Sequence, residues 1–468
     1  MIPLTLSDIA EVTGGRLAGG ATGAELIDGP VEFDSRKAAP GGLFVAIPGE
    51  RVDGHDFAAT ALAAGSVAVL GTRDIGVPAV LVEDVLVALG RLARVVLDRL
   101  PQLTVVGVTG SSGKTSTKDL IAQLLARLGP TVAPPGSFNN ELGHPYTVLR
   151  ADQDTRYLVL EKSARGLGHV RWLTEVAPPR IGVVLNVGAA HVGEFGGIEV
   201  TAKAKGELVE ALPPAAAGGV AVLNTDDGRV RAMRDRTDAK VVLVGQAADA
   251  DIRAEDVELD VAGRASFTLV TPAGRVSVTL GLHGEHHVGN ALAAAAVALE
   301  LGLPLSEVGP ALGAATAVSR RRMEVFERSD GVTVVDDSYN ANPDSVRAAL
   351  KALKSMSAGG SRRAWAVLGP MGELGAQSRD EHDAIGRLVV RLDIDRLVVV
   401  GEDAGPIHAG AVLEGSWGEE SVHVPDTDAA ARLLEAELRP GDIVLVKASN
   451  SAHLERITEA LLGKEGTA

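Results

Sequence analysis

The 468-residue chain has no cysteine, no excess of positive charge and no long apolar run. Without cysteine the protein can form no disulfide, no thiolate nucleophile and no cysteine-ligated zinc site. The formal net charge of −16 argues against nucleic acid or an anionic membrane as the main partner. A local group of Lys and Arg side chains could still bind a small anionic substrate.

Signals for secretion or membrane insertion are also missing. Residues 1–8 contain neither a basic region nor the apolar core of a signal peptide. The most apolar stretch, 291–298, is alanine-rich and far shorter than the roughly 20 residues that cross a bilayer. We therefore expect a cytoplasmic protein that does not insert into membranes.

Alternating strand and helix patterns predict an α/β protein of three domains. These are a small N-terminal α/β domain (1–101), a central domain with a parallel sheet (102–318) and a C-terminal Rossmann-like domain (319–468). The first contains strands at 43–47 and 67–70 and a helix at 57–64. The predicted strands of the other two are 103–108, 157–160, 181–185 and 220–223, and then 332–335, 364–368, 396–400 and 443–446. Continuous apolar strands favour parallel sheets covered on both faces, which bind ligands at the strands' carboxyl ends.

Residues 109–115, Thr-Gly-Ser-Ser-Gly-Lys-Thr, carry the clearest functional signal. They follow the predicted strand 103–108 and open a segment with helical spacing of leucines. A strand, a glycine-bearing loop and a helix together present backbone N–H groups to phosphates. Lys114 would add a positive charge and Thr115 a hydroxyl for Mg²⁺, which predicts nucleoside triphosphate binding. The central domain, 102–318, is therefore predicted to be a P-loop-type ATPase domain. The match is partial, because the common spacing places glycine where Val108 stands; the alternative is an ordinary Gly/Ser turn.

Two further side chains follow neighbouring predicted strands. Glu161 comes directly after 157–160, and His191 comes a few residues after 181–185. If these strands flank the loop strand, both side chains converge with Thr115 and could ligate Mg²⁺, for which histidine is an unusual ligand. Taken singly, Glu161 could be a helix-start carboxylate and His191 an ordinary loop residue.

The other polar clusters allow structural explanations as well. Lys205 lies on a predicted helix, where a lysine is ordinarily solvated. Asn290 could cap the alanine-rich helix or contact a base. The segment 336–343 could be a bare turn, and Lys447, at the end of a strand, could face an anion.

Two loop clusters lie in the first domain. They are Asp34-Ser35-Arg36 and Asp53-Gly54-His55, and both suit a polar ligand as well as they suit a turn.

Together these motifs resemble the Mur ligase family, the ATP-dependent amide-forming enzymes of cell-wall precursor synthesis. The matching features, spread over essentially the whole chain, are 109–115, Glu161, 186–191, the lysine motif that ends at Lys205, and Gly289-Asn290. Within the family, Phe-Asn-Asn-Glu-Leu-Gly at 138–143 and Asp-Ser-Tyr-Asn-Ala-Asn-Pro at 337–343 resemble the members that add D-alanyl-D-alanine to UDP-N-acetylmuramoyl-tripeptide.

The resemblance implies an ATP and metal site. The residues that would bind ATP are Thr109, Gly110, Ser111, Ser112, Gly113, Lys114, Thr115, Ser116, Asn290, Arg322 and Asp337. Two Mg²⁺ ions would be held by Thr115, Glu161, His191 and Lys205, which family members carry as a carbamate formed with CO₂. The catalytic set would be Lys114, Lys205, Glu161 and His191.

The resemblance also implies the substrates, UDP-N-acetylmuramoyl-tripeptide and D-Ala-D-Ala. The residues that would bind them are Ser35, Arg36, Asp53, His55, Asn139, Asn140, Tyr339, Asn340, Asn342 and Lys447, with the first domain holding the UDP-sugar end. ATP would convert the tripeptide carboxylate to an acyl phosphate, which the amine of D-Ala-D-Ala attacks. We expect a monomer with no nucleic-acid partner.

Three residues depart from the family pattern: Lys162 replaces an apolar residue, Pro370 an acidic one and Asn450 an arginine. A lysine beside Glu161 could repel Mg²⁺ if it pointed inward, although successive strand residues face opposite sides. The alternative functions are another ligase of the superfamily, which the motif at 339–343 disfavours, and a catalytically weak homologue that acts as a nucleotide- or precursor-binding scaffold. The third residue of the tripeptide, diaminopimelate or lysine, stays open.

Overall fold

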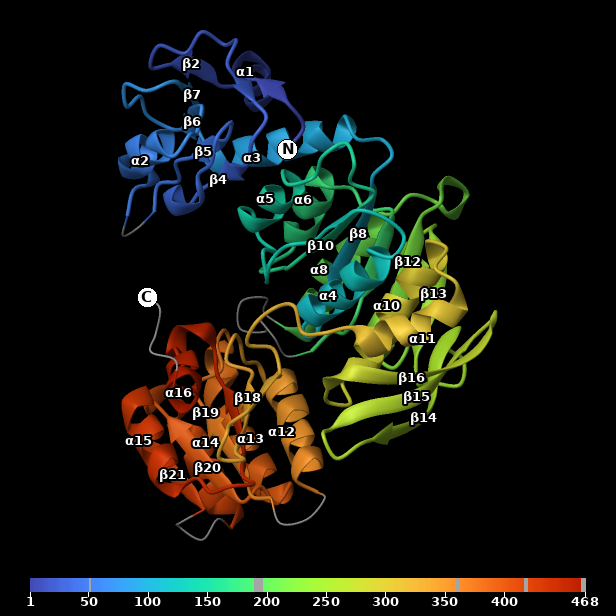
Figure 1. Ribbon diagram of the computed structural model, residues 1–468. Helices are drawn as coiled ribbons and strands as arrows, with labels where there is room; N and C mark the ends of the chain where they lie inside the picture. Colours follow the sequence, from blue (N-terminus) through green and yellow to red (C-terminus); the bar gives the residue numbers. More distant parts are fainter. Residues whose placement is uncertain (50–51, 189–196, 359–361, 416–419, 464–468) are drawn as a thin grey trace.

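The computed structural model describes residues 1–49, 52–188, 197–358, 362–415 and 420–463 (Figure 1). Within these ranges the strands form a two-stranded, a five-stranded, a nine-stranded and a six-stranded sheet, arranged in that order along the chain. This mixed α/β architecture agrees with the predicted fold class.

The five-stranded sheet of the N-terminal region has the order β2-β7-β6-β5-β4. Its strands are β2 (Arg16–Ala18), β4 (Val31–Glu32), β5 (Leu43–Val45), β6 (Ala68–Gly71) and β7 (Ala79–Leu81), and β1 (Leu4–Thr5) pairs separately with β3 (Leu26–Ile27). Strands β5 and β6 confirm the two predicted ones, and the predicted helix is η2 (Gly54–Phe57) followed by α2 (Ala58–Ala63). Helices α1 (Leu6–Thr13) and α3 (Val85–Asp98) complete the N-terminal region.

The nine-stranded sheet of the central region has the order β16-β15-β14-β13-β12-β11-β8-β10-β9. Its strands are β8 (Thr104–Thr109), β9 (Thr131–Val132), β10 (Tyr157–Glu161), β11 (Ile181–Val184), β12 (Val220–Asn224), β13 (Lys240–Gly245), β14 (Ile252–Leu259), β15 (Arg264–Thr271) and β16 (Gly274–His283). All pairs from β9 to β14 are parallel, as predicted. The antiparallel extension of β14, β15 and β16 was not predicted.

Helices cover both faces of the central sheet (Figure 1). They are α4 (Lys114–Leu125), α5 (Gly143–Val148), α6 (His169–Val176), α8 (Ile198–Glu210), α9 (Gly228–Arg231), α10 (His287–Glu300) and α11 (Leu305–Ala314). On one face Val106 and Val108 pack against Leu120 and Ile121 of α4 and against the buried alanines of α10. Because alanine side chains are small, α10 lies close to α4 and to the phosphate loop from which α4 begins.

The six-stranded sheet of the C-terminal region has the order β17-β18-β22-β19-β20-β21, and only β17 is antiparallel. Its strands are β17 (Glu324–Glu327), β18 (Thr333–Asp336), β19 (Ala364–Leu368), β20 (Arg396–Val400), β21 (Ser421–Val424) and β22 (Ile443–Lys447). The covering helices are α12 (Pro343–Ser357), α13 (Ser378–Arg391), α14 (Gly405–Glu414), α15 (Thr427–Glu437) and α16 (Glu455–Leu461). Separate apolar clusters on the two faces confirm a sheet covered on both sides.

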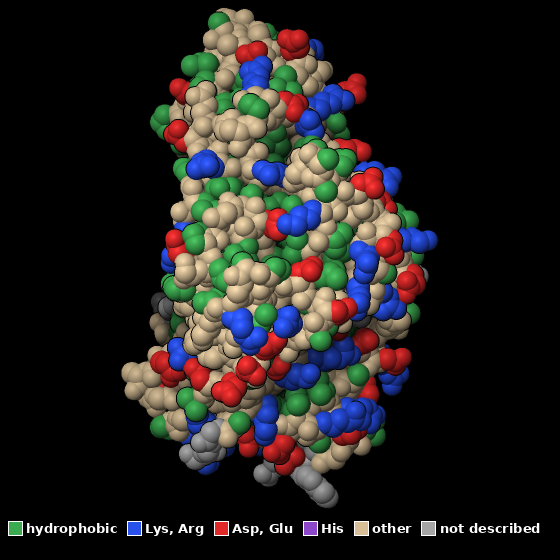
Figure 2. Space-filling model, turned by 90° about the vertical axis from the view of Figure 1, so that its right-hand side faces the viewer, with side chains coloured by type: hydrophobic (Ala, Val, Ile, Leu, Met, Phe, Trp, Pro, Cys, Tyr) green, Lys and Arg blue, Asp and Glu red, His purple; other side chains and the backbone are tan. Residues whose placement is uncertain are grey.

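Two general features bear on partners. On the face shown in Figure 2, acidic and basic side chains are interspersed over the surface. In the part of the chain that the structure describes, no helix has both the length and the apolar character needed to cross a bilayer.

Candidate active site

A cavity of about 640 Å³ lies where the carboxyl edge of the central sheet meets the C-terminal unit. It brings together many of the predicted residues: Ser111, Ser112, Gly113, Lys114, Thr115, Ser116, Asn139, Asn140, Glu161, Arg322, Tyr339, Asn340 and Asn342. Thr109 and Gly110 are buried and line neither this cavity nor the smaller one described below. The site is therefore shared by two units whose sequences lie far apart.

The phosphate loop ends in a helix whose N-terminus has no side-chain cap. Gly113 precedes α4 with φ +80°, and a Cβ there would lie 2.6 Å from Asn290 Oδ1, so glycine is required. The amide oxygen of Asn186 accepts the N–H groups of Ser111 (2.8 Å) and Ser112 (2.9 Å), which fixes the loop. The uncapped N–H groups of α4 and its dipole favour an anion at this position.

Lys114 lies against the loop and close to an acidic side chain. Its Nζ donates to the carbonyl of Gly110 at 2.8 Å. Burial lowers the pKa of Lys114, while the carboxylate of Glu161 acts in the opposite direction. A phosphate beside Lys114 would favour its charged form in the same way.

The side chain of Glu161 suits a metal ligand, because it is buried and receives few hydrogen bonds. It ends β10 opposite Val108 of β8 and is fully buried. Its Oε2 accepts a hydrogen bond from Asn139 Nδ2 at 3.3 Å, whereas Oε1 has no hydrogen-bond partner among the described residues. A buried carboxylate oxygen without a donor is costly unless a cation satisfies it, and Mg²⁺ prefers such oxygens.

The rest of the predicted metal set is only partly placed. Thr115 Oγ1 lies 2.7 Å from Ser137 Oγ at the cavity wall, and His191 lies outside the described residues. Lys205 is buried on α8, 1% exposed, and lines neither cavity. Within the described ranges, no group of three or more His, Asp or Glu side chains could hold a metal ion.

Lys162 points away from Glu161, as expected for the next residue of a strand. Its Nζ lies 2.9 Å from His144 Nε2, and it donates to the carbonyls of Leu173 (2.9 Å) and Ala177 (3.1 Å). Burial lowers the pKa of Lys162 well below its usual value. The lysine is thus held under the sheet and does not face the cavity.

A smaller cavity, about 130 Å³, adjoins the loop and holds the predicted nucleotide residues Asn290, Arg322 and Asp337. Asn290 lies inside α10 and accepts a hydrogen bond from Thr117 Oγ1 (3.1 Å), so it is not the helix cap. Lys447 lines this cavity and not the larger one; its Nζ donates to Asp337 Oδ2 at 2.6 Å and to the carbonyl of Asn340 at 2.9 Å. Asp337 therefore already neutralises Lys447.

His286 and His287 also line the smaller cavity. Their adjacency in the sequence argues only against a shared metal ion, because neighbouring helix residues do not share a face, and no other role was predicted for them. Burial lowers the pKa of His286 to about 4, and its Nδ1 has no partner among the described residues. Two histidines one residue before Gly289-Asn290 were the available signal, since both lie at the start of α10 beside the loop.

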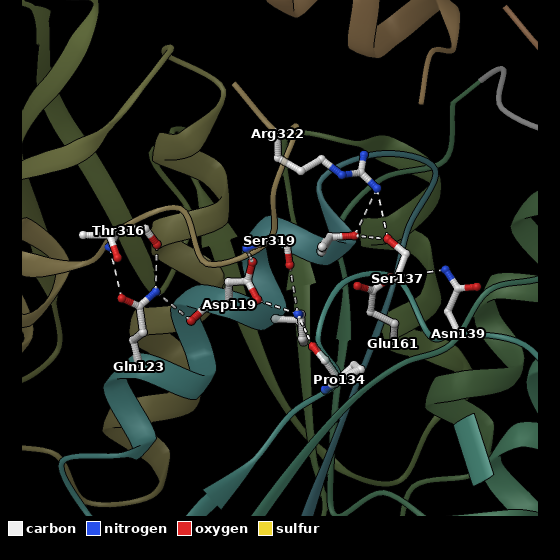
Figure 3. A network of polar contacts seen from close by, with 11 residues as sticks. Asp119, Gln123, Pro134, Ser137, Asn139, Glu161, Thr316, Ser319 and Arg322 are labelled. Carbon is white, nitrogen blue, oxygen red and sulfur yellow. Dashed lines mark hydrogen bonds and ion pairs between the residues drawn. The ribbon is translucent and has the colours of Figure 1, made fainter. Parts of the chain in front are cut away.

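The C-terminal unit contributes Arg322, Tyr339 and Asn342 to the larger cavity. Arg322 Nη2 donates to Ser137 Oγ (3.0 Å) and Thr115 Oγ1 (3.3 Å) (Figure 3). Its guanidinium lies 4.4 Å from the centre of the Tyr339 ring. Asn342 caps α12 by accepting the Ser345 N–H at 2.9 Å, and its Nδ2 donates to the Ser111 carbonyl at 3.3 Å. These contacts join the C-terminal unit to the phosphate loop.

The predicted residues of the N-terminal region line neither cavity. The Arg36 side chain is 84% exposed and pairs with Asp34 at 2.9 Å, beside Ser35. His55 Nδ1 donates to Asp53 at 2.6 Å; this ring and the backbone N–H of His55 lower the pKa of Asp53 to about 2. The structure therefore does not bring these residues together with the phosphate loop.

The site combines a phosphate loop at the edge of a parallel sheet with a buried carboxylate on the adjacent strand. A second unit adds an arginine over the loop. This combination defines a nucleoside-triphosphate-dependent enzyme. Three family models match the chain: Mur ligase family, catalytic domain, at 30–96; Mur ligase middle domain at 108–298; and Mur ligase, glutamate ligase domain, at 321–450. The chain belongs to the Mur ligase family.

Relatives and solved structures agree over the full length. The UDP-N-acetylmuramoyl-tripeptide–D-alanyl-D-alanine ligase of Mycobacterium tuberculosis is 51% identical, with 99% of each chain covered, and that of Escherichia coli is 37% identical, with 98% and 99% covered. A crystal structure of MurF from Acinetobacter baumannii superposes with a TM-score of 0.87 at 31% identity, covering 99% of each chain. The MurF ligase of Thermotoga maritima in complex with ADP gives 0.79 at 29% identity, covering 93% and 97%.

Proposed function

We propose that this chain uses ATP to join D-alanyl-D-alanine to the tripeptide carboxylate of UDP-N-acetylmuramoyl-tripeptide, through an acyl phosphate. The observation that carries the proposal is the full-length identity of 51% with a ligase named for these two substrates. The phosphate loop and the motif that begins at Tyr339 line the same cavity, which supports transfer between ATP and a substrate bound there.

The residues on the two sides of the cavity have complementary tasks in phosphoryl transfer. Lys114 and the N–H groups of α4 hold the phosphates from the central unit, and Arg322 adds a positive charge from the C-terminal unit. Glu161 and Thr115 are placed to hold Mg²⁺, which when bound neutralises charge on the transferred phosphoryl group. No side-chain nucleophile is needed, because the substrate's own carboxylate attacks the phosphorus.

Lys205 is proposed to carry a carbamate and, with His191, to serve a second Mg²⁺. Burial and the nearby charge of Lys114 lower the pKa of Lys205 well below its usual value. A lowered pKa increases the fraction of neutral amine, which is the form that reacts with CO₂. The product is an anion, which suits a position close to Lys114 better than a second cation does.

The two substrates are assigned to different parts of the chain. Asn139, Asn140, Tyr339 and Asn340 are proposed to contact the peptide end, because they line the same cavity as the loop. Asn342 contacts the loop itself, and Lys447 supports Asp337 in the smaller, nucleotide-facing cavity.

The first domain, 1–101, is proposed to bind the UDP end at Ser35, Arg36, Asp53 and His55. The domains 102–318 and 319–468 then act as the ATP-binding and ligase domains. We propose a cytoplasmic monomer.

The structure removes the main support for a catalytically weak scaffold, since Lys162 faces away from Glu161. The other two departures also lie outside both cavities, although Ser449 and Ser451, which flank Asn450, line the larger one. The carbonyl of Pro370 accepts the Ser449 N–H at 2.8 Å. The residues that line the cavities retain the chemistry that ligation requires.

A coupled assay tests the proposal. The protein is incubated with Mg·ATP and UDP-N-acetylmuramoyl-tripeptide, with and without D-Ala-D-Ala, and phosphate and product mass are measured. Phosphate release that depends on both substrates, with a pentapeptide product, is expected. ATP binding without release would favour the scaffold function, and a product with another amino acid would identify another ligase. Tripeptides ending in diaminopimelate and in lysine are compared in parallel.

A further inference from the structure

The segment 315–323 connects α11, which ends at Ala314, to β17, which begins at Glu324, and its first half is fastened to α4. Gln123 Oε1 accepts the Thr316 N–H at 3.0 Å, and Gln123 Nε2 donates to the Thr316 carbonyl at 3.0 Å. Asp119 Oδ2 accepts the Ser319 N–H at 3.0 Å (Figure 3). The helix that begins at the phosphate loop thus holds the connecting segment at two points.

A buried ion pair supports the second of these points. Asp119 is paired with Lys118 Nζ at 2.5 Å, and both side chains are nearly inaccessible. Lys118 Nζ also donates to the Pro134 carbonyl at 2.7 Å and to Ser319 Oγ at 3.3 Å. A buried pair contributes little net stability compared with apolar residues, and its effect here is to define the geometry at Ser319.

The second half of the segment belongs to the C-terminal unit. The Arg321 N–H donates to Glu324 Oε2 (3.0 Å), and the Met323 N–H donates to Asp337 Oδ1 (3.2 Å). Arg321 and Met323 have φ of +60° and +52°, in the left-handed region that residues with side chains rarely occupy. Such conformations persist where the surrounding contacts impose them.

Arg322 lies between these two constrained residues and reaches back to Thr115, at the start of α4, and to Ser137, in the segment after β9. The path from Asp119 through Ser319 and Arg322 to Thr115 therefore closes on a single helix. Only two residues separate Ser319 from Arg322, so a shift at Ser319 changes where the guanidinium lies.

We infer that Asp119 and Gln123 are positioning residues for phosphoryl transfer: they fix the connecting segment on α4 so that Arg322 is presented to Thr115. The effect on ligation rests on the proposed function, whereas the effect on nucleotide binding does not. A role limited to packing would lower stability without acting through Arg322.

A double-mutant cycle of Gln123→Ala and Arg322→Ala tests the inference. Because a small misplacement of a charged group is costly, Gln123→Ala should lower kcat/KM for ATP by roughly tenfold in the wild-type background and hardly at all in the Arg322→Ala background. Equal losses in both backgrounds would overturn the inference. Gln102→Ala is the matched control, since its Nε2 donates to the Gln153 carbonyl at 3.1 Å away from the connecting segment, and it should leave kcat/KM unchanged.

The same cycle is measured on the Kd of a non-hydrolysable Mg·ATP analogue, which requires no ligase activity. If the wild type does not ligate, the proposed function fails, and the binding cycle still decides the positioning role: a weakening that disappears in the Arg322→Ala background supports it, and an additive weakening overturns it. Asp119→Asn is a second variant, and its melting temperature shows whether it folds.

Discussion

At the scale of single residues, two neighbours on β10 have opposite surroundings. Glu161 ends in the cavity with one carboxylate oxygen that has no partner among the described residues, and Lys162 is fully buried on the other side with three acceptors. Alternation along a strand separates them. Lys162, which departs from the family pattern next to the proposed metal ligand, is therefore part of the buried interior and does not face the cavity.

Glu161→Gln should abolish most of the activity while the protein stays folded. The change removes the negative charge but keeps the shape, so Mg²⁺ loses a ligand and activity should fall by roughly 10²–10³-fold. The check is kcat as a function of Mg²⁺ concentration. Glu141→Gln, in the same cavity but half exposed, is the control and should change kcat far less. Wild-type Mg²⁺ dependence in Glu161→Gln would remove this residue from the metal site.

Lys162→Met should lower stability and leave catalysis intact. The substitution leaves His144 Nε2 and two carbonyls without their buried donor, which costs about 1–3 kcal/mol. Denaturant unfolding should show this loss of free energy, with kcat close to that of the wild type. A large fall in kcat without a loss of stability would place Lys162 in the site after all.

At the scale of elements, buried histidines make stability depend on pH. Burial lowers the pKa of His286 at the start of α10 to about 4, from an ordinary value of 6.5. Burial also lowers the pKa values of His144 and His287 well below 6.5. The unfolded chain then binds protons that the folded chain does not, so stability is full above pH 6.5 and is lost as the pH falls toward 4.

The variant His286→Asn tests this pH dependence. His286 alone should account for about 3 kcal/mol of the loss between pH 6.5 and 4. Unfolding free energies measured across this range should therefore fall less steeply in the variant than in the wild type. Equal slopes would mean that the pKa of His286 is the same in the folded and the unfolded chain.

The elements also show how far the sequence predicts this fold. Strands such as β8, β10, β19 and β22 are covered on both faces and therefore read as continuous apolar runs. The antiparallel strands β14, β15 and β16 alternate between buried and partly exposed residues. Because they contain no continuous apolar run, they were not predicted from the sequence.

The candidate site also contains residues that the local sequence predicts and residues that it does not. The phosphate loop and Glu161 follow from local sequence, because a strand's end fixes where the next residue lies. Other parts of the site depend on contacts between segments that lie far apart in the sequence. They are the hydrogen bonds of Asn186 to the loop and the contacts of Ser137 and Asp119. The burial of Lys205 and the pairing of Lys447 with Asp337 are likewise tertiary effects that no local pattern contains.

At the scale of the whole molecule, catalysis depends on two units meeting over one loop. Asn342 connects them directly, since it caps α12 and donates to the Ser111 carbonyl. Its loss should therefore affect both the stability of the C-terminal unit and the affinity for ATP.

Asn342→Ala should cost about 1 kcal/mol of stability through the lost cap and should also weaken ATP binding. The matched control is Asp426→Ala, which removes the cap of α15 but touches neither cavity, and should lower stability without changing the Kd for ATP. Denaturation and calorimetric titration measure the two effects. Identical ATP affinity in both variants would mean that the contact with Ser111 contributes nothing.

The central claim is that the chain activates the tripeptide carboxylate as an acyl phosphate, and an isotope measurement tests it most directly. UDP-N-acetylmuramoyl-tripeptide labelled with ¹⁸O in the terminal carboxylate is turned over with Mg·ATP and D-Ala-D-Ala, and the released phosphate is analysed by mass. One carboxylate oxygen stays on phosphorus when the amine displaces the phosphate, so each product phosphate should carry one oxygen from the labelled carboxylate. Pentapeptide formed together with unlabelled phosphate would contradict the account.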